Sequence, residues 1–479
     1  MSLSGAMNAA LTALRANQTA LQITAANIAN AGQAGYNRKT AEREAIILPG
    51  QAGAGVRISD YGREVSAALL RQVEGLTAGA GSNDARSSYL RRLGDLFAIG
   101  TESPLVTSSF QRFTGAWQAY GTSPENSALA REVVLAGDQL AAELRRVSAG
   151  ITEVDNAIQT DISTAVADLN RNLAEIRDLN SQIAIGQGAG LPTGDAEDRR
   201  DTLIGKVADI MQVRRSDRAD GTAALFTPAG LSLVDTLPAS FQVTFQIAGT
   251  TITRTGETTS VTAGLSGGRL AALVALRADS SPANPSSDPG AETLRKLRDQ
   301  INTIAGFLAN PSVVGEPQSF RDAYNAGATG AGELAAEFFT NALGTNVGVD
   351  ASNIQVNTAL LNASLRIKRV GSSAVVAALY APGRAFSADG LTIAGASYGS
   401  IINGIVGDIA QSVNVSNDAN ERASAAKSAL EGRYRGAVGI NIDDEVAQLT
   451  VLQNAYAAAA RVLSVIQEMY DALAQATGR

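Results

Sequence analysis

The residue types that most often carry enzymatic chemistry are sparse in this sequence. The chain contains neither Cys nor His. Their absence excludes thiolate nucleophiles, disulfides, His-type zinc or haem ligands, and the side chain best suited to proton transfer near neutral pH. Three clusters remain that could bind phosphate or a metal ion: Gly186-Gln-Gly-Ala-Gly190, Gly205-Lys206 and Asp443-Asp444-Glu445.

Each of these clusters has a plainer structural interpretation. The glycine cluster follows a long helical pattern, whereas a phosphate loop follows a strand, so a helix end explains it better. Val207 follows Lys206 where a Walker site has Ser or Thr. Neighbouring helical residues point about 100° apart, so the acidic triplet cannot converge on one ion and is expected to cap a helix and complement its dipole. Paired-carboxylate or Ser-Lys catalysis depends on folded proximity, and nothing here favours it. We therefore expect no catalytic, cofactor-binding or metal site, and no enzyme.

The composition indicates helices that pack closely. The chain has 479 residues, which allows two to four domains because single cores stop growing at roughly 250 to 300 residues. Hydrophobic residues make up 45% but aromatic residues 5%, a usage typical of bundles and coiled coils. The net charge of -7 without a basic stripe argues against nucleic acid and anionic membranes as partners. We also expect no membrane span and no Sec signal peptide.

Two apolar seams with 3-4 spacing lie at opposite ends of the chain. One runs from Leu3 to Ile28 and the other from Leu449 to Leu473, behind Asn441 as a plausible N-cap. Neither helix can bury its stripe alone, so we expect the two to pair. The competing interpretation is that each end packs separately on its neighbouring domain.

The middle of the chain reads as helical, then β-rich, then mixed. Ser103-Pro104 and Ser123-Pro124 resemble N-caps followed by Pro at the first helical position. A long amphipathic helix is predicted over 151–183, and a further helix capped by Asp195 over 195–210. The remaining predictions are hairpin strands at 241–247 and 251–255, helices at 268–276 and 291–308 around a Pro/Ser-rich turn at 280–290, short elements over 311–400, and a helix from Ile401.

The expected fold class is multidomain, mainly α with a β-rich insert. A discontinuous helical bundle or coiled coil is built from both termini, with a small β-rich outer domain in the middle. Four domains are predicted: a terminal axial core (1–75 plus 430–479), a helical bundle (76–211 plus 265–310 and 400–429), a β-rich domain (212–264) and a mixed region (311–399).

Motifs at both ends of the chain resemble one family. The runs Ala25-Ala-Asn-Ile-Ala-Asn30 and Ala34-Gly-Tyr-Asn-Arg38 resemble the signature shared by axial flagellar proteins of rod, hook and junction, and the Gly-Tyr-x-Arg form is similar to the hook-associated protein 1 family in particular. Near the other terminus, Gly439-Ile-Asn-Ile-Asp-Asp-Glu-Val446, Leu452-Gln-Asn-Ala-Tyr456 and Ala460-Arg-Val462 look like its C-terminal signature. Internal matches are Asp198-Arg-Arg-Asp-Thr-Leu203, Gly267-Gly-Arg-Leu270 and Glu337-Phe-Phe339. Long family members carry a further outer domain, which we expect to be missing or vestigial here.

The seams and the resemblance together imply an assembly interface at both ends. The N-terminal positions are Leu3, Met7, Leu14, Leu21, Asn27, Ile28, Asn30, Gly35, Tyr36 and Arg38. The C-terminal positions are Leu449, Leu452, Tyr456, Leu463, Ile466, Tyr470 and Leu473. Asn27 and Asn30 are suited to bonding backbone at a helix end, and Gly35 permits a turn there.

The resemblance implies a structural subunit at the junction between hook and filament. It would leave the cell unfolded through the flagellar type III export channel, guarded by a cytoplasmic chaperone, and act outside the cell. Its partners would be a ring of like subunits, the hook protein and the second junction protein, hook-associated protein 3. The alternatives are the hook protein or another axial protein, a secreted enzyme carried on the flagellum, and a generic coiled-coil adhesin.

Overall fold

The structure, a computed structural model, divides into two compact units that are both discontinuous in sequence. It describes residues 3–46, 55–99, 105–235, 243–248, 251–255, 261, 264–277, 293–312, 315–388 and 391–478. Unit 1 comprises Met1–Gly81, Val166–Gly268 and Ala423–Arg479, and unit 2 comprises Ser82–Ala165 and Arg269–Arg422. The finer division into four domains stays a prediction.

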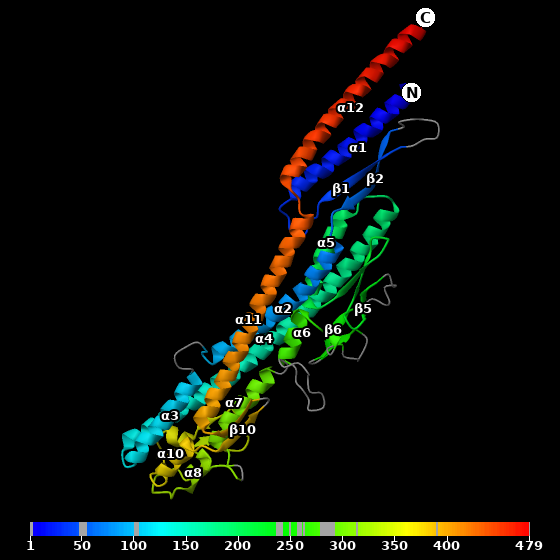
Figure 1. Ribbon diagram of the computed structural model, residues 1–479. Helices are drawn as coiled ribbons and strands as arrows, with labels where there is room; N and C mark the ends of the chain where they lie inside the picture. Colours follow the sequence, from blue (N-terminus) through cyan, green and yellow to red (C-terminus); the bar gives the residue numbers. More distant parts are fainter. Residues whose placement is uncertain are drawn as a thin grey trace. The chain divides into compact units, whose positions relative to one another are not determined.

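The two ends of the chain form paired helices in unit 1. Helix α1 (Leu3–Asn30) and helix α12 (Ile442–Thr477) run side by side and antiparallel, with both termini at the same end of the pair (Figure 1). The Asn441 side chain accepts a hydrogen bond from the Asp443 amide at 3.1 Å, so it caps α12 as predicted. The pairing of the terminal helices confirms the expectation drawn from the two seams.

An antiparallel hairpin that the sequence did not reveal follows α1. Strand β1 (Lys39–Ala45) pairs with β2 (Val56–Arg63), from Lys39 opposite Arg63 to Ala45 opposite Val56. The strand KTAEREA carries charges at four of its seven positions, so it lacks the alternation of apolar and polar residues that signals a half-buried strand. The hairpin lies against α1 (Figure 1).

The helical body follows with helix α2 (Ala67–Leu96), α3 (Leu105–Thr122) and the 62-residue α4 (Ser127–Gly188). The prediction that Ser123-Pro124 starts a helix is wrong. Those residues form a turn, and the Asn126 carboxamide caps α4 by accepting from the Ala128 amide at 2.9 Å. The Ser103-Pro104 start lies outside the described residues.

The glycine cluster ends α4, as predicted, with Gly190 at a φ of 68°. Helix α5 (Gly194–Ile210) then begins one residue before Asp195, which lies in the first turn and is therefore not the cap. Thr193 occupies the N-cap position, and its hydroxyl bonds the Glu197 carboxylate at 2.6 Å instead of a backbone amide.

The predicted β-rich insert is confirmed in unit 1. Strands β3 (Arg214–Asp217), β4 (Ala223–Phe226) and β5 (Ser232–Val234) form one antiparallel sheet in that order, and β6 (Phe245–Ala248) pairs with β7 (Thr251–Arg254). The predicted hairpin thus holds for its described part, while 241–242 and 249–250 lie outside the described residues. Helix α6 (Gly268–Arg277) follows as expected.

Unit 2 is built around an aromatic core. Trp117 on α3 is fully buried, with ring centroids 5.8 Å from both Phe320 and Phe338. Around it lie α7 (Thr293–Ala309), α8 (Phe320–Ala326), β8 (Phe339–Thr340), β9 (Gln355–Val356), α9 (Thr358–Leu361), α10 (Ser372–Tyr380), β10 (Arg384–Ala388), β11 (Leu391–Ala396) and the start of α11 (Tyr398–Val438). The short elements predicted after residue 311 are confirmed, and the predicted turn at 280–290 lies outside the described residues. Across the described residues the chain is mainly helical with a β-rich insert, as the sequence predicted.

Candidate assembly interface

The paired terminal helices bury different kinds of side chain. On α12, Leu452 and Ile466 are 1% and 5% exposed, so two members of the predicted seam pack fully against their surroundings. On α1, the buried residues are small or polar: Ala10, Ala16, Asn17, Ala20, Thr24 and Asn27. Small side chains let α1 lie close to both α12 and the hairpin, which explains why its leucines are not the most buried positions.

The remaining predicted interface residues are less buried. Eight of them in the N-terminal region are half-buried: Leu3, Met7, Leu14, Leu21, Ile28, Asn30, Tyr36 and Arg38. Four on α12 are also half-buried: Leu449, Tyr456, Leu463 and Tyr470. Gly35 is exposed, as is Leu473 at the end of α12. Half-buried apolar positions along a helix pair leave surface that a further helix could cover.

Asn27 holds the start of the hairpin against α1. Its Nδ2 donates to the Lys39 carbonyl at 2.9 Å, and its Oδ1 accepts from the Lys39 amide at 3.0 Å. The Tyr36 hydroxyl donates to the same Oδ1 at 3.1 Å. Asn27 therefore pairs with a strand backbone twelve residues away, whereas the sequence suggested a bond at the helix end. Asn30 does bond there, through the Ala26 carbonyl at 2.9 Å.

Arg38 joins the hairpin to α12. Its Nε donates to Glu445 at 2.5 Å and its Nη2 donates to Gln448 at 3.0 Å. Glu445 is 1% exposed and also accepts from the Asn27 Nδ2 at 3.3 Å. The expectation that helix capping and the dipole suffice for the acidic triplet is thus wrong for Glu445, which bonds two elements from the other end of the chain.

The residues on either side of Arg38 bond α5. The Asn37 Nδ2 donates to Asp198 at 2.6 Å, and its Oδ1 accepts from the Tyr434 hydroxyl of α11 at 2.9 Å. Lys39 pairs with Asp195 and lies 3.6 Å from Asp198. Three consecutive residues therefore each bond a different set of elements, and we call residues 36–39 the joint.

The turn that leads into the joint requires glycine. Gly35 has a φ of 84°, a left-handed conformation that residues with a side chain rarely adopt. A Cβ added there would lie 2.5 Å from the Thr202 hydroxyl of α5. Both the left-handed backbone conformation and the close approach to α5 therefore require a residue without a side chain at position 35.

A buried cluster of charges continues from the joint into the body of unit 1. Arg63 of β2 lies 2.6 Å from Glu197, 3.0 Å from Asp198 and 2.6 Å from Asp201. Arg215 of β3 lies 2.8 Å from Asp201, and the same guanidinium lies 3.3 Å from Glu74 of α2. Four elements are therefore tied together by side chains that are at most 15% exposed. We call Arg63, Glu74, Glu197, Asp198, Asp201 and Arg215 the buried charge cluster.

Burial and charge act in opposite directions within this cluster. Burial by itself would raise the pKa of Asp201, but the nearby charges of Arg215, Arg63 and Arg200 outweigh it and lower the pKa. Glu74 shares a single arginine with Asp201, so burial prevails and raises the pKa of Glu74 to about 7. The pKa of Glu74 is thus shifted in the opposite direction to that of Asp201.

A second apolar stripe on α12 is left open in the single chain. Val451, Val462, Val465, Met469 and Leu473 are between 51% and 66% exposed. At 100° per residue they fall on one side of the helix, next to the face that packs on α1. Exposed aliphatic side chains gathered in this way are typical of interaction surfaces.

One window of 18 residues within Tyr398–Ala476 is apolar enough to cross a membrane by length and composition alone, and 11% of it is buried. The expectation that the chain has no membrane span stays a prediction. The alanines between the two stripes raise the average apolar character without making a continuous apolar run. One such helix is weak evidence for a membrane, because helices of soluble proteins pass the same test.

Sequence reasoning missed the polar partners in this region. Asn37, Arg63, Asp198 and Tyr434 come from four separate parts of the chain, and nothing in their spacing shows that they meet. The signal that could have found Glu445 is its place four residues before Leu449, on the seam face of α12. Among the residues that the structure describes, no group of three or more acidic side chains could hold a metal ion.

Comparison with known proteins finds similarity to flagellar proteins. The model of the flagellar hook-associated protein FlgK helical domain matches residues 90–313, and that of the flagellar basal body rod FlgEFG protein C-terminal region matches residues 436–476. Flagellar hook-associated protein 1 of Salmonella typhimurium is 27% identical over 238 residues, which span 48% of this chain and 43% of that protein. The protein of the same name from Bacillus subtilis is 27% identical over 242 residues, 48% of each chain.

The matched region thus covers less than half the length of these relatives. A solved structure, the flagellar hook junction protein FlgK from Burkholderia pseudomallei, is 15% identical with a TM-score of 0.45 and covers 57% of this chain and 46% of that one. A similarity this low does not bear on the argument. The two family matches fall on the helical body and on α12, and with the named relatives they show that the chain is similar to flagellar hook-associated protein 1 over about half of its length.

Proposed function

We propose that this chain is a structural subunit of the bacterial flagellum that forms the junction between hook and filament, and that it is not an enzyme. The observation that carries the proposal is the pair of terminal helices, one face of which is packed while the stripe Val451–Leu473 stays open. Burying a Val, Leu or Met side chain contributes roughly 1.5 to 3 kcal/mol. Several such residues on one stripe can therefore drive assembly through the termini.

The proposed partners follow from the similarity to flagellar hook-associated protein 1 and from this surface. They are like subunits in a ring, the hook protein, hook-associated protein 3 and a cytoplasmic export chaperone. The proposed location of the protein is the extracellular part of the flagellum, which it reaches through flagellar type III export. The net charge of -7 supports the expectation that neither nucleic acid nor an anionic membrane is a partner.

The terminal helices are proposed to gain order on assembly. In the free chain the open stripe gives α12 few contacts beyond those with α1 and the joint, so local opening costs little. Amide exchange on the free chain is expected to be fast in α1 and α12 and slow in α4. Strong protection of both terminal helices in the free chain would contradict this.

Two other functions are less consistent with the chain. The hook protein shares the terminal signatures but is mostly β between them, whereas this chain has the 62-residue α4 in that place. A secreted enzyme would need a carboxylate pair or a metal site. Loss of a measurable hydrolytic activity on mutating such a pair would favour that class.

The decisive experiment changes the open stripe without touching the packed seam. Val462→Lys places a charge on the stripe, and Ser464→Lys adds the same charge to an exposed position roughly 200° around the helix. Both variants are used to complement a deletion strain. We expect hooks without filaments for Val462→Lys and normal filaments for Ser464→Lys. Normal filaments in both would refute the role of the stripe.

A further inference from the structure

The two most exposed large apolar side chains among the described residues lie in one loop of unit 2. Leu343 is 86% exposed and Val347 is 78% exposed. We call residues 341–348 the knob loop. A single exposed aliphatic side chain is ordinary on a protein surface, but two in one short loop form a feature that packing within the chain does not explain.

The side chain of Asn341, which is 9% exposed, holds the knob loop in shape. Its Oδ1 accepts from the Leu343 amide at 2.9 Å and from the Thr345 amide at 3.1 Å, and its Nδ2 donates to the Val347 carbonyl at 2.9 Å. Its own backbone amide donates to the Thr345 carbonyl at 2.7 Å. Gly344 supplies the turn between these bonds with a φ of 75°, a conformation that other residues rarely adopt. One buried amide side chain therefore fixes the backbone that carries both aliphatic side chains.

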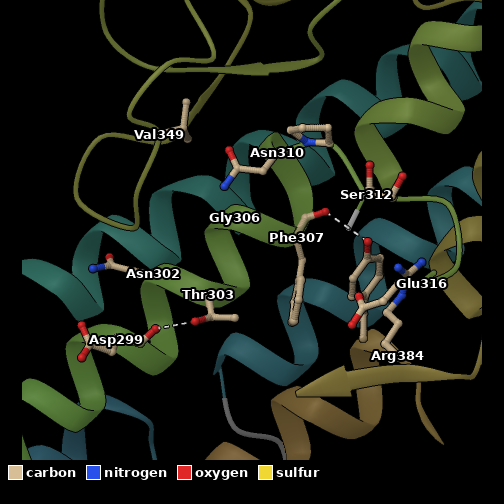
Figure 2. Close-up of a pocket in the computed structure, with 13 residues that line it drawn as sticks. Asp299, Asn302, Thr303, Gly306, Phe307, Asn310, Ser312, Glu316, Val349 and Arg384 are labelled. Carbon is tan, nitrogen blue, oxygen red and sulfur yellow. Dashed lines mark hydrogen bonds between the residues drawn. The ribbon is translucent and has the colours of Figure 1, made fainter. Parts of the chain in front are cut away.

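The knob loop begins directly after β8, and its far end is anchored on α7. Val349 directly follows the loop, is 7% exposed and lines a pocket beside α7 (Figure 2). Two residues later, the Ala351 amide donates to the Asn302 Oδ1 of α7 at 3.1 Å. The Asn353 Nδ2 also donates to the Gly348 carbonyl at 2.9 Å. Because the loop is braced inside and tied down at its end, its two aliphatic side chains stay held out toward solvent.

We propose that the knob loop binds a second copy of this chain, the neighbouring subunit in the junction ring. Leu343 and Val347 would pack on an apolar part of the neighbour's surface. This inference rests on the assembly proposed above and adds to it a contact that unit 2 makes.

The small size of the knob loop decides which partner it fits. A stable interface between two freely diffusing proteins takes roughly 20 to 30 residues a side, and two aliphatic side chains fall far short of that. So small a contact becomes effective only when another contact already holds the partner nearby at a high effective concentration. Between like subunits, the open stripe on α12 supplies that first contact. A rigid loop also loses little conformational entropy on binding, which favours a small contact further.

Photo-crosslinking in assembled flagella tests the identity of the partner. The photoreactive amino acid p-benzoylphenylalanine is placed at position 343 of the full chain, and the control carries it at position 156, an exposed site on α4 in the same unit. Each chain complements a deletion strain, and flagella are isolated, illuminated and examined by immunoblotting and mass spectrometry. We expect a product of two copies of this chain, in several-fold higher yield from position 343 than from position 156.

The outcomes separate this inference from the proposed function. A product with a different protein only, no product, or equal yields from both positions, with the chain present in the isolated flagella, would overturn the contact and leave the proposed function standing. Absence of the chain from the isolated flagella would refute the proposed function, and the contact with it.

Two matched variants test whether the contact strengthens the junction. Leu343→Ser removes an aliphatic side chain that makes almost no contact within the chain, and Thr345→Ser changes an exposed polar side chain of the same loop. Melting curves of both should therefore match the parent. Under shear, flagella with Leu343→Ser are expected to lose filaments several times more often than the parent, and those with Thr345→Ser as often as the parent. Equal loss from both variants would overturn the proposal.

Discussion

Replacing Glu74 by Gln is expected to remove a pH dependence from the stability of unit 1. Glu74 is 5% exposed, and the charged groups that act on it are Arg215, Asp201 and Asp217. Burial raises the pKa of Glu74 from 4.5 to about 7. Between these two values the folded state binds more protons than the unfolded state, so the free energy of unfolding falls as the pH rises.

The size of the effect follows from the difference between the two pKa values. Each pKa unit corresponds to about 1.4 kcal/mol, so Glu74 contributes up to about 3 kcal/mol that is fully present below its unfolded pKa and is lost as the pH rises past about 7. A Gln side chain resembles the protonated carboxyl group and does not titrate. The Glu74→Gln variant should therefore match the parent at about pH 4, below the unfolded pKa, and be more stable than it at about pH 8.

Amide exchange in α5 reports on this region, because α5 carries the aspartate that shares Arg215 with Glu74. Intrinsic exchange rates also change with pH, so parent and variant are compared at each pH. We expect equal protection at about pH 4 and roughly tenfold or more extra protection of the variant at about pH 8. Equal protection at both pH values, or a variant less protected at the higher pH, would refute the reasoning.

Three further predictions concern the seam, a glycine and the joint. Leu463→Asp places a charge on the packed face of α12 and should block incorporation into flagella while unit 2 stays folded, so filaments on cells that carry it would count against the seam. Gly268→Ala should lower the free energy of unfolding by roughly 2 to 4 kcal/mol, because φ is 76° and an added Cβ would lie 2.4 Å from the backbone of Ile210. The control is Gly188→Ala, whose added Cβ meets nothing within 4 Å. Urea melts should show that this control leaves the free energy of unfolding unchanged. Asp198→Asn should speed amide exchange at residues 37–39 at least tenfold by losing a charge that three groups share, and exchange unchanged there would contradict the role of the joint.

The sequence predicted those parts of the fold that depend on local periodicity. The two seams predicted α1 and α12, because apolar residues recur in them with helical spacing. Asn441 predicted the start of α12, because its side chain can accept a hydrogen bond from the amide two residues later. The pairing of the two helices also followed, since each seam required a partner from elsewhere in the chain. The β-rich insert followed from alternation in 241–255.

Features that depend on distant polar partners could not be predicted. The bond between Asn37 and Asp198 joins positions 161 residues apart, and the bond between Arg38 and Glu445 joins positions 407 residues apart. Residues this far apart in sequence produce no local pattern from which their contact could be predicted. The hairpin was missed because its strands are charged, and Ser123-Pro124 misled because a capping pair also suits a tight turn. The interface residues named from the two seams stay predictions until assembly is measured.

The pairing of α1 with α12 also constrains when this part of the molecule can form. During synthesis Leu3 is added to the chain more than 400 residues before α12 is made. Until then, α1 lacks the helix on which it packs in the folded chain. Contacts between residues this far apart in sequence form slowly, because the entropy cost of closing the loop comes before the contacts stabilise the chain. The helix pair therefore forms last, after the middle of the chain has been made. If the pair assembles as proposed, this topology by itself opposes polymerisation during synthesis.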